Sequence, residues 1–215
     1  MKTSPSRVKT LTPKEDEPDF GAYHHSSLIR SAKVREKVKV LFTKVFDDDL
    51  PFQRDDELKI LDVGCGLGFL SYVCAEFYPN SSVTGFDTFD DVSLRDSSLE
   101  KARRNARILG LSDRIVFKRG DILRSDYRGK RFDLLVSNLV FHNLGKKRFD
   151  AYERVASWAT PKSYVVLGDL FFDYKAEVRF LSSVFGSVER ATSGSSLGPG
   201  LNYKVLVLTD PKSVE

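Results

Sequence analysis

The sequence has few of the features that mark membrane, secreted or metal-binding proteins. It contains only two cysteines, Cys65 and Cys74, in 215 residues. They form no CxxC pair and no Cys/His cluster with metal-ligand spacing, so we expect two buried thiols and no metal site. No apolar run approaches the roughly 18–20 residues that span a bilayer, and the N-terminus lacks the apolar stretch of a secretory signal. These absences predict a cytoplasmic globular protein without a membrane span.

Positive charge is concentrated near the N-terminus. The chain has a net charge of +4, and residues 1–46 hold ten Lys/Arg against five Asp/Glu. The remaining residues are therefore close to neutral. A surface that binds an anionic partner is expected only in the N-terminal segment.

The first 46 residues divide into a tail and a helix. Residues 1–26 are polar, contain three prolines and show no periodicity, which predicts a flexible tail. Residues 27–46 are predicted to be helical, because apolar residues recur at spacings of four, three and four. These residues are Val34, Val38, Leu41 and Val45. The other face of the helix is basic: Arg30, Lys33, Lys37 and Lys44.

Strands and helices alternate beyond residue 55. Five apolar strands are expected, at residues 59–63, 82–87, 115–118, 132–137 and 164–167. Helices are expected at 69–77, from Ser97, at 149–156 and at 178–185. Two last strands, 187–192 and 203–209, have a connector too short for a crossover helix, so they should be antiparallel. The pattern predicts an α/β fold: a doubly wound, mostly parallel seven-stranded sheet with a C-terminal antiparallel hairpin, in one domain over residues 27–215 with its core at 55–210.

The most informative segment is KILDVGCGLGF, residues 59–69. A buried strand leads into a turn with Gly64, Gly66 and Gly68, and a helix follows at once. Glycine tolerates positive φ and lets the backbone pass close to a ligand, and a helix N-terminus presents free N–H groups. The next strand ends in Asp87, where an acid can accept hydrogen bonds from ribose hydroxyls. The segment therefore indicates a site for a ribose-containing cofactor.

A dinucleotide-binding oxidoreductase is the nearest competing interpretation. Its fingerprint is GxGxxG, whereas this turn reads GxGxG, with Phe69 in place of the third glycine. The chain also lacks a second nucleotide-binding half and ends in a hairpin. All three differences disfavour an oxidoreductase.

The segment DVGCGLG, residues 62–68, resembles motif I of the class I S-adenosylmethionine-dependent methyltransferases. The resemblance implies S-adenosyl-L-methionine as cofactor and S-adenosyl-L-homocysteine as product. It implies that the glycine turn wraps the methionine part, that Asp87 holds the ribose, and that Asp121 and the backbone of Ile122 lie near the adenine. The candidate cofactor-binding residues are Asp62, Gly64, Cys65, Gly66, Gly68, Asp87, Thr88, Asp121, Ile122 and Asn138.

Candidate catalytic residues follow the fourth and fifth strands. Asn138 ends the fourth strand, where the resemblance implies that the acceptor approaches the methyl group. His142 lies just beyond and could orient or deprotonate an acceptor. Asp169 closes the fifth strand at the carboxyl edge of the sheet, where sites form. Three residues ahead of the first helix could fold over the cofactor: Tyr23, His24 and His25.

The acceptor is the least constrained part of the prediction. The segment FDLLVSNLVFHNL, residues 132–144, resembles the same region of family members that methylate small molecules. The Asn-Pro-Pro-Tyr/Phe signature of many amino-methyltransferases is absent, because Asn138 is followed by Leu-Val-Phe. These features favour a small-molecule acceptor. An RNA or protein methyltransferase that uses the basic N-terminal segment is the alternative, a cofactor-binding protein without turnover is a third, and the oligomeric state stays open.

Overall fold

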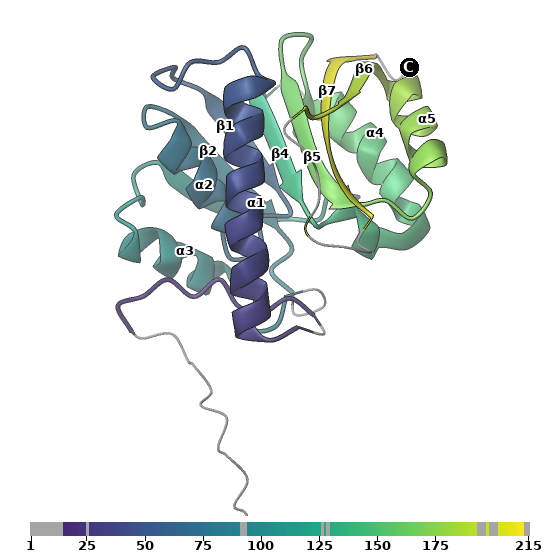
Figure 1. Cartoon of the computed structure of the whole chain (residues 1–215). Helices are drawn as coiled ribbons and strands as arrows, with labels where there is room; N and C mark the ends of the chain where they lie inside the picture. The colour runs from purple at the N-terminus through teal and green to yellow at the C-terminus, as the bar shows by residue number, and fades with distance from the viewer. Residues whose placement is uncertain are drawn as a thin grey trace, which may run out of the picture.

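The computed structural model describes residues 15–24, 26–90, 94–125, 127, 130–192, 197 and 202–212. Seven strands in this part of the chain form one sheet in the order β3-β2-β1-β4-β5-β7-β6 (Figure 1). The strands are β1 (Lys59–Val63), β2 (Ser82–Asp87), β3 (Ile115–Arg119), β4 (Leu134–Asn138), β5 (Tyr164–Leu170), β6 (Phe185–Arg190) and β7 (Tyr203–Pro211). β1 to β5 are parallel, and β7 runs antiparallel to both β5 and β6. The predicted fold class and the C-terminal hairpin are confirmed.

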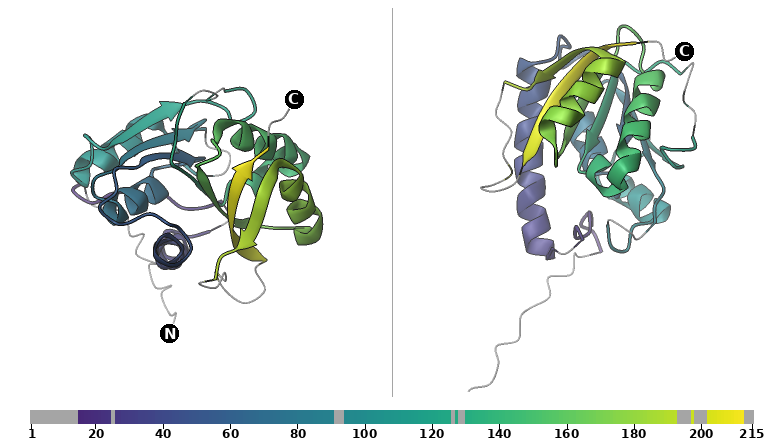
Figure 2. Two further views of the ribbon diagram at one scale, coloured as in Figure 1. Left: turned by 90° about the horizontal axis from the view of Figure 1, so that it is seen from above. Right: turned by 90° about the vertical axis from the view of Figure 1, so that its right-hand side faces the viewer.

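Helices cover both faces of the sheet (Figure 2). They are α1 (Leu28–Asp48), α2 (Phe69–Phe77), α3 (Leu99–Ile108), the 3-10 helix η1 (Phe141–Lys147), α4 (Arg148–Trp158) and α5 (Tyr174–Val184). Residues of α1, α2 and α3 share one apolar cluster with the sheet, and residues of α4 and α5 share a second. The central parallel strands β1, β4 and β5 are buried from both sides, which is why they read as continuous apolar runs.

The order of the strands places the site. β1 pairs with β2 on one side and with β4 on the other, so the direction of chain progression reverses between β1 and β4. Ligands of doubly wound sheets bind outside the carboxyl ends of the strands at such a switch point. The glycine turn after β1 and the end of β4 therefore lie at the expected position.

Several predicted boundaries shift by a few residues. The third helix is capped by Ser98, whose hydroxyl accepts from Lys101 N, and not by Ser97. α5 begins at Tyr174 because Asp173 caps it, and Phe185 already belongs to β6. η1 was not predicted, since its seven residues lack a recognisable helical period.

Some described residues of the predicted N-terminal tail, from 15 onward, contact the rest of the domain. Asp19 exchanges backbone hydrogen bonds with the side chain of Asn105 on α3. The Phe20 ring packs edge-on against Phe69, with centroids 5.3 Å apart. Tyr23 forms an isolated antiparallel bridge with Leu94. The polar composition of this segment did not indicate these contacts. Residues 1–14 and His25 lie outside the described part of the chain.

Candidate active site

The glycine turn adopts a conformation that requires glycine. Gly64, Gly66 and Gly68 have φ values of 73°, 52° and 87°, in the left-handed region that disfavours other residues. Gly68 is the N-cap of α2 and has no side chain to accept hydrogen bonds from the first turn of the helix. The N-terminus of α2 thus offers N–H donors to an anionic group of a ligand.

Asp87 closes β2 beside this turn. Its Oδ2 accepts a hydrogen bond from Gly66 N at 2.9 Å, and its Oδ1 accepts one from Phe89 N at 2.7 Å. The carboxylate fixes the middle of the turn, and its remaining lone pairs can accept from ligand hydroxyls. Burial raises the pKa of Asp87, although the two backbone N–H donors oppose that rise.

Asp62 lies beneath the turn and joins β1 to α2. The Ser71 hydroxyl donates to Asp62 Oδ2 at 2.6 Å, and both side chains are almost completely buried. Burial raises the pKa of Asp62 to about 7, with a further contribution from the nearby Asp87 charge. This acid therefore anchors the first turn of α2.

The remaining cofactor candidates near β1 and β2 have structural partners. Cys65 and Cys74 are free and buried, which confirms the predicted thiols. Burial raises the pKa of the Cys65 thiol well above its usual range, which disfavours the reactive thiolate. The carbonyl oxygen of Thr88 accepts from the Arg119 guanidinium at 2.5 Å.

Asp121 and Ile122 follow β3 at the same edge of the sheet. Gly120 N donates to the carbonyl oxygen of Asp87 at 2.9 Å, so this loop adjoins the end of β2. The Asp121 side chain accepts from Leu123 N at 2.9 Å, while Ile122 is buried in the apolar cluster on the α4 side. The position agrees with an adenine-side role, which stays a prediction.

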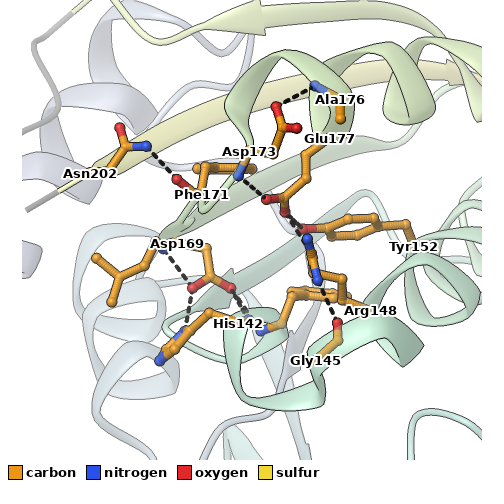
Figure 3. Close-up of polar contacts among 12 residues, drawn as sticks. His142, Gly145, Arg148, Tyr152, Asp169, Phe171, Asp173, Ala176, Glu177 and Asn202 are labelled. Atoms are coloured by element: carbon orange, nitrogen blue, oxygen red, sulfur yellow. Dashed lines mark hydrogen bonds and ion pairs between the residues drawn. The ribbon is translucent and has the colours of Figure 1, made fainter.

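His142 and Asp169 form a close pair where β4 and β5 end (Figure 3). His142 Nδ1 lies 2.5 Å from Asp169 Oδ1. Asp169 Oδ2 accepts from Phe141 N at 2.7 Å and from His142 N at 3.3 Å. Asp169 is 1% exposed, and its carboxylate holds both the backbone and the ring of His142. Sequence reasoning selected both residues but did not predict that they touch.

Asn138 has a partner that was not predicted. The Tyr203 hydroxyl, at the start of β7, donates to Asn138 Oδ1 at 2.7 Å. Tyr203 is completely buried, and burial raises the pKa of its phenol well above the usual range. Tyr203 thus donates to Asn138 from a buried phenol. β7 reaches this edge because it is antiparallel to β5.

A second buried network supports the turn that carries His142 (Figure 3). Glu177 is 1% exposed, and its Oε2 accepts from Arg148 Nε and from the Tyr152 hydroxyl, each at 3.0 Å. Arg148 also donates to the carbonyl oxygen of Gly145 at 2.6 Å. The network connects η1, α4 and α5 behind the His142–Asp169 pair.

An N-terminal strap, residues 19–23, crosses the glycine turn. The buried Asn105 side chain donates to the carbonyl oxygens of Asp19 and Leu67 and thereby ties the strap to the turn. Arg35 of α1 donates to the carbonyl oxygens of two strap residues, at 3.1 and 2.8 Å. A Cβ on Gly66 would lie 2.9 Å from Leu94 Cδ2, so Leu94 also lies over the turn. Tyr23 bridges to Leu94, and the expectation that residues ahead of the first helix fold over the cofactor stays a prediction.

Two of these unpredicted residues had a signal in the sequence. Asn105 and Arg35 each lie on the apolar side of a predicted helix, Asn105 between Ala102 and Ala106, and Arg35 three residues before Val38. A polar side chain at such a position is buried and must have partners. The basic face of α1, in contrast, is exposed at all four predicted positions.

A family model described as a methyltransferase domain matches residues 54–190. The chain belongs to this family. It is a class I S-adenosylmethionine-dependent methyltransferase. No helix within the described ranges is long and apolar enough to cross a membrane.

Relatives of this methyltransferase act on different acceptors according to their names. Malonyl-[acyl-carrier protein] O-methyltransferase of Halalkalibacterium halodurans is 25% identical over 163 residues, 73% of this chain and 56% of the relative. The release factor glutamine methyltransferase of Chlorobaculum tepidum is 41% identical over 174 residues, 68% and 57% of the two chains. tRNA1(Val) (adenine(37)-N6)-methyltransferase of Porphyromonas gingivalis is 38% identical over 85 residues, 38% and 31% of the two chains. The matched segments therefore cover 31% to 57% of the length of these relatives.

Solved structures share the fold of this methyltransferase. Magnesium protoporphyrin IX methyltransferase from Synechocystis has a TM-score of 0.60 at 18% identity, covering 84% of this chain and 81% of that one. At such identity the likeness shows the fold alone.

The residues of the methyltransferase fit S-adenosylmethionine. The cofactor carries a carboxylate, which suits the uncapped N-terminus of α2. Its two ribose hydroxyls suit the free lone pairs of Asp87, and the left-handed glycines keep the turn open to a ligand. These features suit the methionine and ribose parts of the cofactor, and the individual contacts stay predictions.

Proposed function

We propose that this methyltransferase transfers the methyl group to a small-molecule acceptor, with His142 as general base and Asp169 as the residue that orients it. The observation that carries the proposal is the 2.5 Å contact between His142 Nδ1 and the buried Asp169 carboxylate, one turn beyond Asn138. A carboxylate on Nδ1 keeps that nitrogen protonated and leaves Nε2 as the basic atom. His142 can then remove a proton from an acceptor.

The residues of the chain perform three tasks in this scheme. Asp87, the glycine turn and the N-terminus of α2 bind the cofactor, which supplies a methyl group already activated by its sulfonium. The strap is bridged to Leu94 by Tyr23, and in this proposal the two shield the bound cofactor from water. His142 takes the acceptor proton at Nε2 as the acceptor is held in line with the methyl group. A base is needed where the acceptor is a neutral hydroxyl, which is a poor nucleophile until it loses its proton.

Two features support a small molecule over a macromolecule. The chain beyond residue 46 is nearly neutral overall, so its net charge gives no long-range attraction for a polyanion. The Asn-Pro-Pro signature found in many enzymes that methylate amino nitrogens is absent after Asn138. One relative has an O-methyltransferase name, which agrees with transfer to an oxygen atom.

RNA is the second candidate, because the basic face of α1 is exposed. Arg30, Lys33 and Lys37 project from the N-terminal half of that helix, near the strap, and one relative is named as a tRNA methyltransferase. If these charges bind RNA, each neutralised phosphate releases counterions and affinity falls steeply with salt.

A single labelling experiment tests the two candidates. The full chain is incubated with radiolabelled S-adenosylmethionine and fractionated cell extract, and the label is followed into small molecules, RNA and protein. We expect label in the small-molecule fraction, and loss of that label in His142→Ala. Label in RNA, together with salt-sensitive binding of bulk tRNA that charge reversal of Arg30, Lys33, Lys37 and Lys44 abolishes, would overturn the proposal.

A further inference from the structure

The orientation of the Asn138 amide is fixed by Tyr203. The Tyr203 hydroxyl is buried, and its one hydrogen bond to another described residue goes to Asn138 Oδ1. Reversing the amide would place an N–H against the hydroxyl and leave the phenolic O–H without an acceptor, which costs about 1–3 kcal/mol for a buried group. The amide oxygen of Asn138 therefore faces Tyr203, and its Nδ2 faces away from β7.

The position of Asn138 makes this orientation relevant to the acceptor. Asn138 is the last residue of β4, and the next residue, Leu139, has a left-handed φ of 58° and donates from its N–H to Gly168 O at 2.8 Å. The chain then turns into η1, which carries His142. The carboxyl edge of the sheet thus presents two different groups: an N–H donor on Asn138 and a basic nitrogen on His142.

One donor and one base suit a hydroxyl better than an amine. A hydroxyl has one proton for His142 Nε2 and two lone pairs, of which one can accept from Asn138 Nδ2 while the other attacks. An amino nitrogen has a single lone pair and two protons, so it needs two hydrogen-bond acceptors to aim that lone pair at the methyl group. The Asn138 amide oxygen is already used by Tyr203.

An exposed aromatic ring lies next to the base. Phe172, two residues after the end of β5, is 70% exposed, the largest value among the exposed large apolar residues of the described chain. Its ring centroid is 6.5 Å from that of His142. Packing of the core does not account for a phenylalanine at this position, whereas a flat apolar part of an acceptor could pack on it.

We infer that the acceptor is an acidic hydroxyl on an apolar ring, a phenol or an enol, held by Asn138 Nδ2 and stacked against Phe172 while His142 removes its proton. In the reaction the acceptor oxygen forms a bond to the methyl carbon, the methyl–sulfur bond breaks with its electron pair going to sulfur, and the hydroxyl proton goes to His142. A phenol, with a pKa of about 10, is within reach of an imidazole base, whereas an aliphatic alcohol is far less acidic. This inference rests on the proposed function.

The atom that receives the methyl group can be identified directly. The full chain is incubated with ¹³C-methyl-labelled S-adenosylmethionine and cell extract, and the labelled product is purified and analysed by NMR and mass spectrometry. We expect long-range coupling from the methyl protons to an sp² ring carbon through oxygen. A methylated nitrogen, a methyl ester or an aliphatic ether overturns this inference and leaves small-molecule methyl transfer standing. Absence of any labelled small molecule overturns the proposed function itself.

Variants separate the two acceptor contacts from folding. With the purified acceptor, we expect Phe172→Ser to raise its KM about tenfold while the affinity for S-adenosylmethionine and the Tm stay unchanged. Val116→Ser, at an apolar residue 52% exposed on β3, is the matched control and should change none of these values.

Asn138→Asp keeps an acceptor for Tyr203 but replaces the N–H donor with a carboxylate, so kcat should fall about a hundredfold. An unchanged acceptor KM in Phe172→Ser, or an unchanged kcat in Asn138→Asp, overturns the corresponding contact.

Discussion

Asp169 Oδ1 lies 2.5 Å from His142 Nδ1, and the other oxygen of the same carboxylate accepts hydrogen bonds from the N–H groups of Phe141 and His142. One buried side chain at the end of β5 therefore sets both the path of the chain after β4 and the tautomer of the imidazole. The position of the His142 ring therefore depends on where β5 places Asp169.

Replacing Asp169 by Asn tests this coupling. The amide oxygen can still accept from the backbone N–H groups, but it no longer favours a proton on Nδ1, so the imidazole loses its orientation. We expect kcat to fall by about a hundredfold or more, with the affinity for S-adenosylmethionine unchanged by calorimetric titration.

The double variant supplies the control. If Asp169 acts through His142, then Asp169→Asn combined with His142→Ala should be no slower than His142→Ala alone, because residues that act as a unit are not additive. A full additional loss in the double variant would show that Asp169 has a separate role.

Asp87→Ala should weaken S-adenosylmethionine binding by about 2 kcal/mol or more, roughly thirtyfold in Kd. The reason is the loss of a carboxylate that can accept from two hydroxyls and also fixes Gly66 N. Asp133→Ala is the matched control, since Asp133 accepts from Lys59 N at 2.8 Å at the opposite edge of the sheet. Equal Kd values for the two variants would remove Asp87 from the cofactor site.

Much of the fold could be predicted because apolar residues recur along each strand and helix with the period of that element. α2 and β2 were predicted with the bounds that the structure has, since glycine or polar residues flank both apolar segments. Shifts occur where a cap decides the boundary, as at Ser98 and Asp173. The sequence near a helix end predicts the first helical residue only when a single residue there can act as the cap.

The site was predictable only to the extent that it is local. Motif I and Asp87 lie in one strand–turn–helix–strand segment, so their spacing indicated a common ligand. Tyr203 meets Asn138 across 65 positions of sequence, and Asn105 meets Asp19 across 86. Such contacts depend on strand order and on how a polar segment packs, which periodicity does not encode.

Gly66→Ala should weaken cofactor binding at least tenfold while lowering stability only modestly. The substitution places a side chain at φ +52°, which costs about 1–2 kcal/mol, and its Cβ would contact Leu94 over the turn. Gly110→Ala is the control, because Gly110 has φ +68° and nothing within 4 Å of an added Cβ. Both variants should unfold at similarly lower urea concentrations. Cofactor binding by Gly66→Ala with normal affinity would contradict the close approach of the turn to the ligand.

Asp62→Asn should stabilise the cofactor-free protein at pH 8. Burial raises the pKa of Asp62 from 3.8 to about 7, so the folded state binds this proton more tightly than the unfolded state. The contribution of this group to the free energy of unfolding is fully present below its unfolded-state pKa of 3.8. It is lost as the pH rises through the folded-state pKa of about 7. Asparagine can still accept a hydrogen bond from Ser71 and carries no charge. At pH 8 the free energy of unfolding should therefore rise by up to roughly 4 kcal/mol. Near pH 4 the variant and the parent should differ little in stability. Urea unfolding at both pH values measures this, and a variant less stable than the parent at pH 8 would refute it.

Asn105→Ala should loosen the strap and the glycine turn together. The Asn105 side chain makes three hydrogen bonds, to Asp19 N, Asp19 O and Leu67 O, at 2.9 to 3.0 Å. At about 1 kcal/mol each, their loss should lower the free energy of unfolding by about 2–3 kcal/mol. Because Leu67 belongs to the turn, the dissociation rate of S-adenosylmethionine, measured by stopped-flow displacement, should also rise several-fold.

Asn80→Ala separates this effect from the general loss of an amide. Asn80 donates a single exposed hydrogen bond to Asp55 O at 2.8 Å, so its removal should change stability by less than about 0.5 kcal/mol and leave the dissociation rate unchanged. If Asn105→Ala loses stability but retains the parent dissociation rate, the strap is a structural brace and does not enclose the cofactor. A faster rate in Asn105→Ala alone would identify the strap, through its buried amide anchor, as the element that retains the cofactor.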